Sequence, residues 1–352
     1  MIDFIKISKI NTKKELKKFK IDEPIFLNNY LFHYLIMTNN LKGIKLDKFP
    51  IYKENNEGLQ GLHLAAKVAN ETKNYDMLNY LLERYPEYAA NLNYFKESFL
   101  DMLDVNDNIF TILKKHKDIN WYRLFTNIVE NEDYKSCYID KIFKTGSFKL
   151  IDYIVDYLEE KKFKWREFQC SPLFMIPLNE KLKTKDKISI FKKVGLETLF
   201  KIIDSSAKSL IYYIIDSNDI DLLKFVIEKE IDLDKYTSIF TRHPFLYSYF
   251  KDSNSDKDFK MTKLIYNNIK ETHNFDSTNK FYENIVFVIM NYRLLSGNGN
   301  DEIEKDILLR NTVWNKQNID KENLFEILVN LSFEKYHKMI SKNVRIDLKL
   351  KN

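Results

Sequence analysis

The sequence predicts an all-α fold in which pairs of short helices repeat along the chain. Only 7 Gly and 6 Pro occur in 352 residues, which is too few for the turns of a β-sandwich or barrel of this length. Charged residues make up 30% of the chain and hydrophobic residues 44%, a balance typical of helices joined by polar loops. Similar apolar segments also recur along the chain, which indicates an array of repeats.

The clearest repeat unit lies within residues 57–83. Its first half reads Glu57-Gly58-Leu59-Gln60-Gly61-Leu62-His63-Leu64-Ala65-Ala66, and its second half contains Asp76-Met77-Leu78-Asn79-Tyr80-Leu81-Leu82-Glu83. Leu62, Ala65 and Ala66 fall on one face of the first helix, where the small alanines let a second helix pack closely. We therefore expect both alanines to be buried between the two helices of this unit.

This unit resembles an ankyrin repeat, which combines a Gly-containing turn, the pattern Thr-Pro-Leu-His-x-Ala-Ala and a second helix similar to Ile-Val-x-x-Leu-Leu. Leu-His-Leu-Ala-Ala fits the pattern, and Gln60-Gly61 replaces the Thr-Pro pair. His33 takes the place of His63 one unit earlier, close to the ankyrin period of about 33 residues. A helical-pair array of the HEAT or TPR kind is the alternative, and it lacks this signature.

Other segments resemble the second ankyrin helix and its exit, and they lie at 144–155, 217–233 and 333–348. Weaker candidates fill the intervals at 98–115, 171–193, 244–269 and 284–309. The spacing predicts an ankyrin-like helical-repeat solenoid of about eight or nine helix pairs. Residues 1–352 would form a single array, with an N-terminal capping segment (1–27), better-matched repeats (28–243), and diverged repeats with a C-terminal cap (244–352).

The resemblance implies a non-enzymatic scaffold that binds another protein through its concave face and loop tips. Diverged arrays of this style are typical of A/T-rich large DNA viruses and some intracellular bacteria, which implies a factor that binds a host protein. One alternative is a structural or assembly component of a virion or complex. Another is an enzyme hidden in the diverged part after Pro244, which a cluster of polar residues in one pocket would favour.

Aromatic residues in the predicted loops are the candidate partner-binding residues, because Tyr and Trp are enriched at interface hot spots. The alternative is that these rings wedge against the neighbouring repeat. The candidates are Tyr52, Tyr94, Trp121, Tyr122, Trp165 and Tyr236.

No catalytic, cofactor-binding or metal-binding residue is predicted. The six His include no His-x3-His pair and no His-Glu-x-x-His helix, so we interpret His33 and His63 as hydrogen-bonding groups at helix starts. Cys137 and Cys170 are expected to be buried apolar residues rather than a redox pair. The one Gly-rich run, 296–300, lacks the Lys-Ser/Thr ending of a phosphate loop.

Two Lys-rich stretches, 13–20 and 181–193, are interpreted as solvated surfaces, with a nucleic-acid or phospholipid contact as the alternative. The net charge of +5 is small, and A/T-rich coding alone favours Lys, so no nucleic-acid partner is expected. No run of about 18 apolar residues occurs, so no membrane span or membrane partner is expected. With two cysteines and no signal peptide evident, we expect a cytoplasmic or host-cytoplasmic protein, with the nucleus as the alternative. No oligomeric state is predicted.

Overall fold

The computed structural model of the chain is mostly helical. The described residues are 4–130, 135–165, 172–195, 204, 208–229, 243–256, 258–271, 288–290, 292, 296 and 298–310. The repeat-like segment expected at 333–348 lies outside them.

The α-helices are α1 (Phe4–Ser8), α2 (Lys13–Leu16), α3 (Leu31–Met37), α4 (Leu41–Ile44), α5 (Gly61–Thr72), α6 (Asp76–Arg84), α7 (Asp107–Lys115), α8 (Trp121–Phe125), α9 (Tyr138–Thr145), α10 (Phe148–Glu160), α11 (Met175–Leu178), α12 (Thr184–Val194), α14 (Leu210–Ser217), α15 (Ile220–Ile227), α16 (Pro244–Ser255), α17 (Lys260–Ile269) and α19 (Asp301–Arg310). Short 3-10 helices are η1 (Pro86–Tyr88), η2 (Phe99–Met102) and η4 (Pro172–Phe174). The strands are β1 (Ile128–Glu130) and β2 (Lys135–Cys137).

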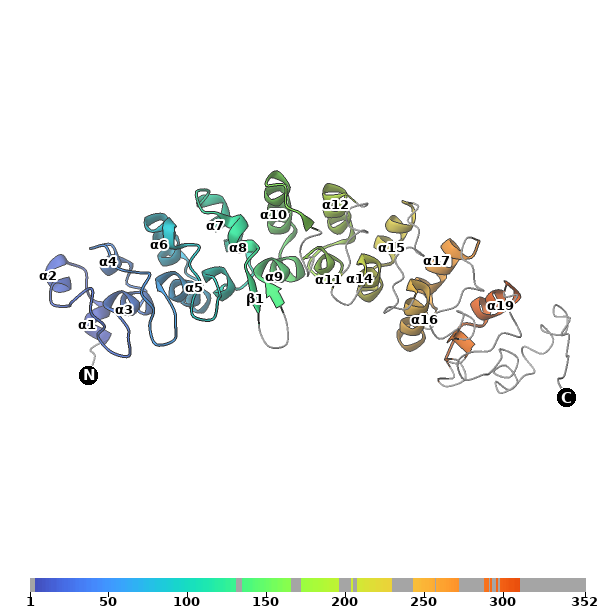
Figure 1. Ribbon diagram of the computed structural model, residues 1–352, viewed down its shortest axis with the longest axis horizontal. Helices are drawn as coiled ribbons and strands as arrows, with labels where there is room; N and C mark the ends of the chain where they lie inside the picture. The colour runs from blue at the N-terminus through green and yellow to red at the C-terminus, as the bar shows by residue number, and fades with distance from the viewer. Residues whose placement is uncertain are drawn as a thin grey trace. The chain divides into compact units, whose positions relative to one another are not determined.

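The chain divides into two compact units, unit 1 (Met1–Gly195) and unit 2 (Leu196–Asn352). In unit 1 the helices form two rows, with α3, α5, α9 and α11 in one row and α4, α6, α7, α10 and α12 in the other (Figure 1). Helices contact their partner in the same pair, as in α3–α4, α5–α6 and α9–α10. They also contact the equivalent helix of the next pair, as in α3–α5, α7–α10 and α10–α12.

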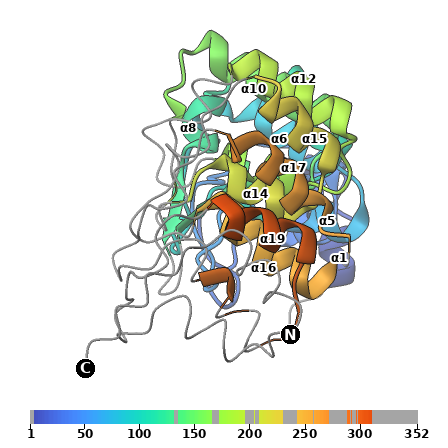
Figure 2. The ribbon, with the colours of Figure 1, turned by 90° about the vertical axis from the view of Figure 1, so that its right-hand side faces the viewer.

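Unit 2 shows the same kind of packing in two helix pairs of its described residues. α14 contacts α15, and α16 contacts α17. Across the two pairs, α14 contacts α16 and α15 contacts α17. Figures 1 and 2 both place α15 and α17 on one side of this unit and α14 and α16 on the other.

The α5–α6 pair has the predicted helical register. Ala65 and Ala66 on α5 are almost completely buried, and so are Leu78 and Leu81 on α6. Lys67, the next residue of α5, is exposed. The alanines therefore lie on the inward face of α5, where a larger side chain would meet packed neighbours.

We expect the Ala66→Phe variant to destabilise unit 1 by about 1–3 kcal/mol, because a ring would overpack this buried face. The measurement is the free energy of unfolding from urea titrations followed by circular dichroism. Lys67→Phe is the matched control, since it adds the same ring at an exposed position. If both variants unfold at the same urea concentration as the parent, the register assigned to α5 is wrong.

The first helix of several pairs begins with the same type of contact. The side chain of its third residue accepts a hydrogen bond from the backbone N–H of the residue just before the helix. At α3, His33 Nδ1 accepts from Tyr30 N at 3.0 Å. At η2, an Asp101 carboxylate oxygen accepts from Ser98 N at 2.8 Å, and at α9 Asp140 accepts from Cys137 N at 3.1 Å. Each contact satisfies a backbone N–H that the helix itself leaves unpaired.

A short β-hairpin, which the sequence did not predict, lies within the mostly helical fold. β1 and β2 pair antiparallel, with Ile128 opposite Cys137 and Glu130 opposite Lys135. Ile128 and Val129 are β-branched, and such residues favour extended backbone. The hairpin lies in the connection between α8 and α9. Its two strands form the one sheet found among the described residues.

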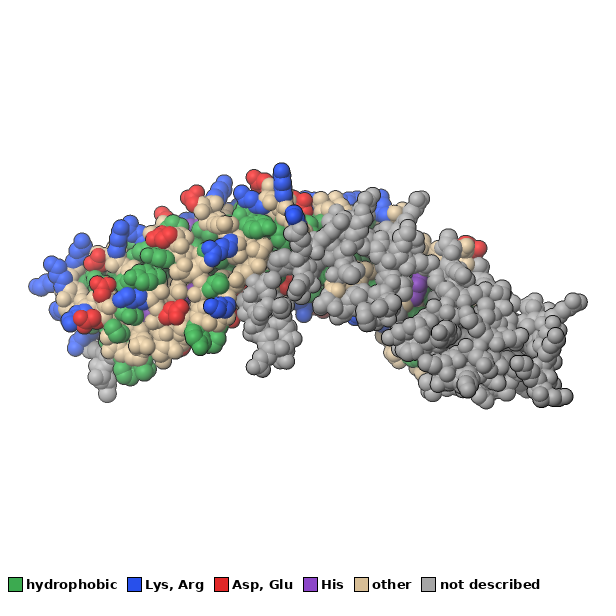
Figure 3. All heavy atoms as spheres, in the orientation of Figure 1, with side chains coloured by type: hydrophobic (Ala, Val, Ile, Leu, Met, Phe, Trp, Pro, Cys, Tyr) green, Lys and Arg blue, Asp and Glu red, His purple; other side chains and the backbone are tan. Residues whose placement is uncertain are grey.

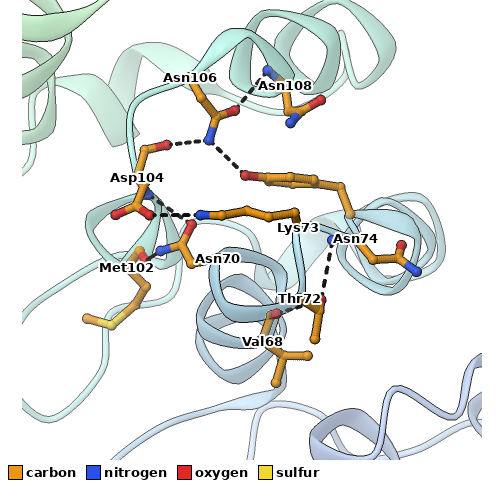
Figure 4. Close-up of polar contacts among 10 residues, drawn as sticks. Val68, Asn70, Thr72, Lys73, Asn74, Met102, Asp104, Asn106 and Asn108 are labelled. Atoms are coloured by element: carbon orange, nitrogen blue, oxygen red, sulfur yellow. Dashed lines mark hydrogen bonds and ion pairs between the residues drawn. The ribbon is translucent and has the colours of Figure 1, made fainter.

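Polar side chains link each pair to the next. Asn70, near the end of α5, donates to Met102 O at 2.5 Å and accepts from Asp104 N at 3.0 Å (Figure 4). Asn106 at the start of α7 donates to Tyr75 Oη at 2.8 Å. These bonds satisfy backbone and hydroxyl groups at the turns between helices, so they help to set the spacing of neighbouring pairs.

Two buried asparagines make a further link of a common form. Asn40 Nδ2 donates to the carbonyl oxygens of Ile7 and Ile10 at 3.1 and 2.9 Å. Asn179 Nδ2 donates to those of Phe143 and Gly146 at 2.9 and 3.0 Å. In both cases the amide donates to carbonyl groups where the first helix of the previous pair ends, which are groups that a helix end leaves short of donors.

Candidate protein-binding surface

The same pair of hydrogen bonds recurs at three places among the described residues. Asn55 N donates to Leu59 O at 3.1 Å, and Leu59 N donates back to Asn55 Oδ1 at 3.0 Å. Asn93 and Glu97 make the same two bonds at 2.8 and 2.9 Å. Asp204 and Lys208 make them at 2.9 and 2.8 Å. In the loops 55–59 and 93–97, one Asn side chain therefore holds the five residues in a single turn conformation.

The closing residue stands at a fixed place before the next helix. In all three loops it lies five positions before the residue that caps the first helix of a pair, and the matched residues are Asn55 with Gln60, Asn93 with Ser98, and Asp204 with Ser209. An Asn or Asp at this spacing is the sequence signal that could have identified the loops. We name the loops of unit 1 tip loop 1 (residues 25–29), tip loop 2 (55–59) and tip loop 3 (93–97).

Tip loop 1 closes through backbone bonds alone, from Ile25 N to Asn29 O and from Asn29 N to Phe26 O, both at 2.8 Å. Its two central residues, Leu27 and Asn28, have positive φ angles of 48° and 54°. Two successive positive φ angles are the geometry of the tightest hairpin turns. This loop is therefore also held in one conformation.

The three tip loops lie side by side. Asn55 Nδ2 donates to Asn29 Oδ1 at 3.3 Å, which joins tip loops 1 and 2. Tyr94 N donates to Gly58 O at 3.4 Å, which joins tip loops 2 and 3. Gly58 has φ +72°, and an added Cβ would lie 2.5 Å from Tyr94 Cβ, so this close approach requires glycine.

The β1–β2 hairpin continues this series of loops. Asn127, just before β1, donates from Nδ2 to Lys96 O of tip loop 3 at 3.1 Å. In Figure 1 the hairpin projects from the same edge of unit 1 as the loops that precede α3 and α5. One edge of unit 1 is therefore a continuous surface of loops.

Large apolar side chains are exposed on tip loops 1 and 3. The exposed fractions are 58% for Phe26, 56% for Leu27, 74% for Tyr94 and 60% for Phe95. Figure 3 shows hydrophobic side chains along the lower margin of unit 1, where these loops lie. Tip loop 2 lies between these two loops, so the side chains form two exposed apolar groups on one edge of unit 1. Exposed apolar groups larger than scattered single residues are a feature of protein-interaction surfaces.

The predicted partner-binding residues fall into three groups. Tyr52, Tyr94 and Tyr122 are exposed, and only Tyr94 lies on a tip loop. The ring of Tyr52 lies 5.5 Å from that of Tyr88, and the ring of Tyr122 lies 5.9 Å from that of Phe163. The ring of Tyr94 lies 5.4 Å from that of Phe95, so each of these three tyrosines packs against a different ring.

Trp121 and Trp165 are buried, with 2% and 3% of their surface exposed. Trp121 Nε1 donates to His116 O at 2.9 Å, and Trp165 Nε1 donates to a Glu159 carboxylate oxygen at 2.6 Å. Both indoles are packed against neighbouring rings. Tyr236 lies outside the described residues. Sequence reasoning missed Phe26, Leu27 and Phe95.

His33 and His63 both bond to backbone near helix starts. His33 Nδ1 accepts from Tyr30 N, so this nitrogen carries no proton. His63 Nε2 lies 3.0 Å from Glu97 O in tip loop 3. Burial lowers the pKa of His33 to about 4, and the backbone of Lys53 and Leu59 offsets part of this effect. Burial also lowers the pKa of His63. Both imidazoles are therefore neutral at neutral pH.

Cys137 is buried, and its Sγ lies 3.2 Å from an Asp140 carboxylate oxygen, while Cys170 lies outside the described residues. Within the part of the chain that the structure describes, no three His, Cys, Asp or Glu side chains are placed to hold a metal ion together. Among the same residues, no helix has the length and apolar character needed to cross a bilayer.

No protein-family model matches the chain, and no curated protein matches its sequence.

Proposed function

We propose that the chain is a diverged ankyrin-like repeat array that binds another protein through tip loops 1–3. Support for repeated units comes from the spacing of the polar contacts between helix pairs. Many of these contacts join residues 31 to 37 positions apart, as in Asn106 with Tyr75, His63 with Glu97, Asn179 with Phe143 and His116 with Asn79. Such a separation is what stacked units of ankyrin length produce.

The observation that carries the binding function is the exposure of Phe26, Leu27, Tyr94 and Phe95 on loops of fixed conformation. A partner that covers these side chains removes apolar surface from water. Because hydrogen bonds already fix the loops, binding costs little loss of backbone freedom. Rigid aromatic anchors on a pre-formed surface are typical of protein-binding sites.

The first step of the test identifies the partner by contact. A photo-crosslinking amino acid replaces Tyr94 in the full chain, and the matched control carries it at Asn74. Asn74 is exposed in the turn after α5, while tip loop 2 precedes α5, so the control lies at the opposite end of that helix. We expect a discrete cross-linked protein from position 94 and not from position 74. The same products from both positions would argue against a site on the tip loops.

The second step measures affinity with the purified cross-linked partner. We expect the triple variant Phe26→Ser, Tyr94→Ser and Phe95→Ser to bind at least about 100-fold more weakly, because interface anchors each contribute about 1–2 kcal/mol. Isothermal titration calorimetry gives the affinities, and circular dichroism checks the fold. Tyr122→Ser, an exposed aromatic change on α8 outside the three tip loops, is the control. A triple variant that keeps the parent affinity would show that the partner binds elsewhere.

A further inference from the structure

The N-terminal end of unit 1 contains the whole formal net charge of the chain. Residues 1–20 include seven Lys and two carboxylates, so they carry +5, which equals the net charge of all 352 residues. The remainder of the chain is balanced, although Lys is abundant throughout. Enrichment of Lys by codon composition therefore does not explain this local excess.

The structure places these lysines on the surface around α1 and α2. All seven are exposed, and they are Lys6, Lys9, Lys13, Lys14, Lys17, Lys18 and Lys20. Figure 3 shows Lys and Arg side chains gathered at this end of unit 1. Lys20 forms an ion pair with Glu23 at 2.8 Å, between two exposed side chains that solvent screens.

In the second Lys-rich stretch, 181–193, some of the lysines bind groups within the protein. Lys187 is buried and donates to Pro177 O at 2.8 Å. Lys193 on α12 lies 2.5 Å from an Asp152 oxygen and 2.8 Å from an Asp156 oxygen, both on α10. Part of this charge therefore supports the packing of α12 on α10, and the two stretches are not equivalent.

An apolar side chain accompanies the exposed lysines. Ile5 on α1 is 65% exposed, although Ile7 and Ile10 nearby are buried. No Arg occurs before Arg84, so this end lacks the planar groups that bind phosphate in a bidentate manner. Point charges beside an exposed aliphatic group suit an anionic lipid surface, which needs neither base stacking nor bidentate contacts.

We propose that this end of unit 1, residues 5–20, docks on the surface of a bilayer that contains anionic lipids. The lysines supply attraction to the headgroups, and Ile5 enters the interface between headgroups and acyl chains. This contact is peripheral and needs no spanning helix, so it revises the expectation of no membrane partner drawn from apolar run length. It is independent of the tip loops, and its test does not involve their partner.

The test measures binding of the full chain to vesicles of phosphatidylcholine, with and without phosphatidylserine, by co-sedimentation. We expect binding only to vesicles with phosphatidylserine, and we expect added salt to weaken it. The triple variant Lys13→Gln, Lys14→Gln and Lys17→Gln should bind about 100-fold more weakly, since each Lys near an anionic surface contributes about a five-fold increase in affinity. The matched control changes Lys181, Lys183 and Lys185 to Gln, and it should bind as the parent does.

Other outcomes would overturn the proposal. Equal weakening by the two triple variants would mean that overall charge, rather than this end, determines binding. Tighter binding to a double-stranded oligonucleotide or to poly-glutamate than to the vesicles would assign the lysines to another polyanion. Ile5→Ser provides a check that leaves the charge unchanged. It should weaken vesicle binding without changing the salt dependence, and parent-like binding by this variant would remove the apolar part of the proposal.

Discussion

The Asn179→Ala variant is expected to destabilise unit 1 by about 3 kcal/mol, because it removes the donor to the carbonyl groups of the buried residues Phe143 and Gly146. Asn179 is completely buried. Its amide donates to Phe143 O and Gly146 O, and its Oδ1 accepts from Lys181 N at 2.9 Å. Alanine removes all three bonds at once. Urea denaturation followed by circular dichroism measures the change in the free energy of unfolding.

Two further variants make this test specific. Asn108 is exposed on α7, so Asn108→Ala should change stability little. Asn179→Asp keeps an acceptor for Lys181 N but turns an oxygen toward the two carbonyl groups. It should destabilise at neutral pH and recover in part in acid, where a protonated carboxyl can donate. A stability of Asn179→Ala close to that of Asn108→Ala would contradict the assigned role of this amide.

The second large effect expected is a loss of stability in acid that depends on His33. The folded-state pKa of His33 is about 4, below the ordinary value of 6.5. The unfolded chain therefore binds a proton at higher pH than the folded chain, and stability falls as the pH drops from 6.5 towards 4. A difference of this size corresponds to about 3 kcal/mol. Protonation would also remove the acceptor for Tyr30 N at the start of α3.

A His33→Gln variant isolates this contribution. Burial raises the pKa values of Asp101 and Asp140, which favours folding in acid and therefore opposes the effect of His33. These carboxylates are present in both proteins, so their contribution cancels in the difference between the two. We expect the unfolding free energy of the parent to fall more steeply between pH 6.5 and 4 than that of the variant. Parallel pH profiles would show that His33 does not titrate in this way.

The sequence predicted the helices best where apolar spacing and small residues act together. The pattern around Ala65 and Ala66 located α5 and the face that it buries. The segment at 217–233 located α15, and the interval at 98–115 contains η2 and α7. A helix that buries one face has apolar residues at regular spacing in its sequence, and this pattern is easy to detect. The β1–β2 hairpin was missed because three-residue strands have almost no period to detect.

The candidate surface was predicted less well, because exposure depends on contacts between distant residues. Trp121 and Trp165 follow second helices, as Tyr122 does, yet both indoles are buried and the Tyr122 ring is exposed. Residue type and loop position cannot separate these cases. Phe26 and Phe95 look like core residues in the sequence, and they are exposed because the turns that carry them are closed by hydrogen bonds at their bases.

The polar links between helix pairs have a consequence for how unit 1 would respond to force. The side-chain bonds of Asn40, Asn70, His116 and Asn179 reach residues 30 to 37 positions away, in the adjacent pair. Each link therefore closes a loop of similar length, at a similar entropic cost. Tension on the chain would load neighbouring interfaces one at a time. Unit 1 would then lengthen in steps of one helix pair and could shorten again by the same steps.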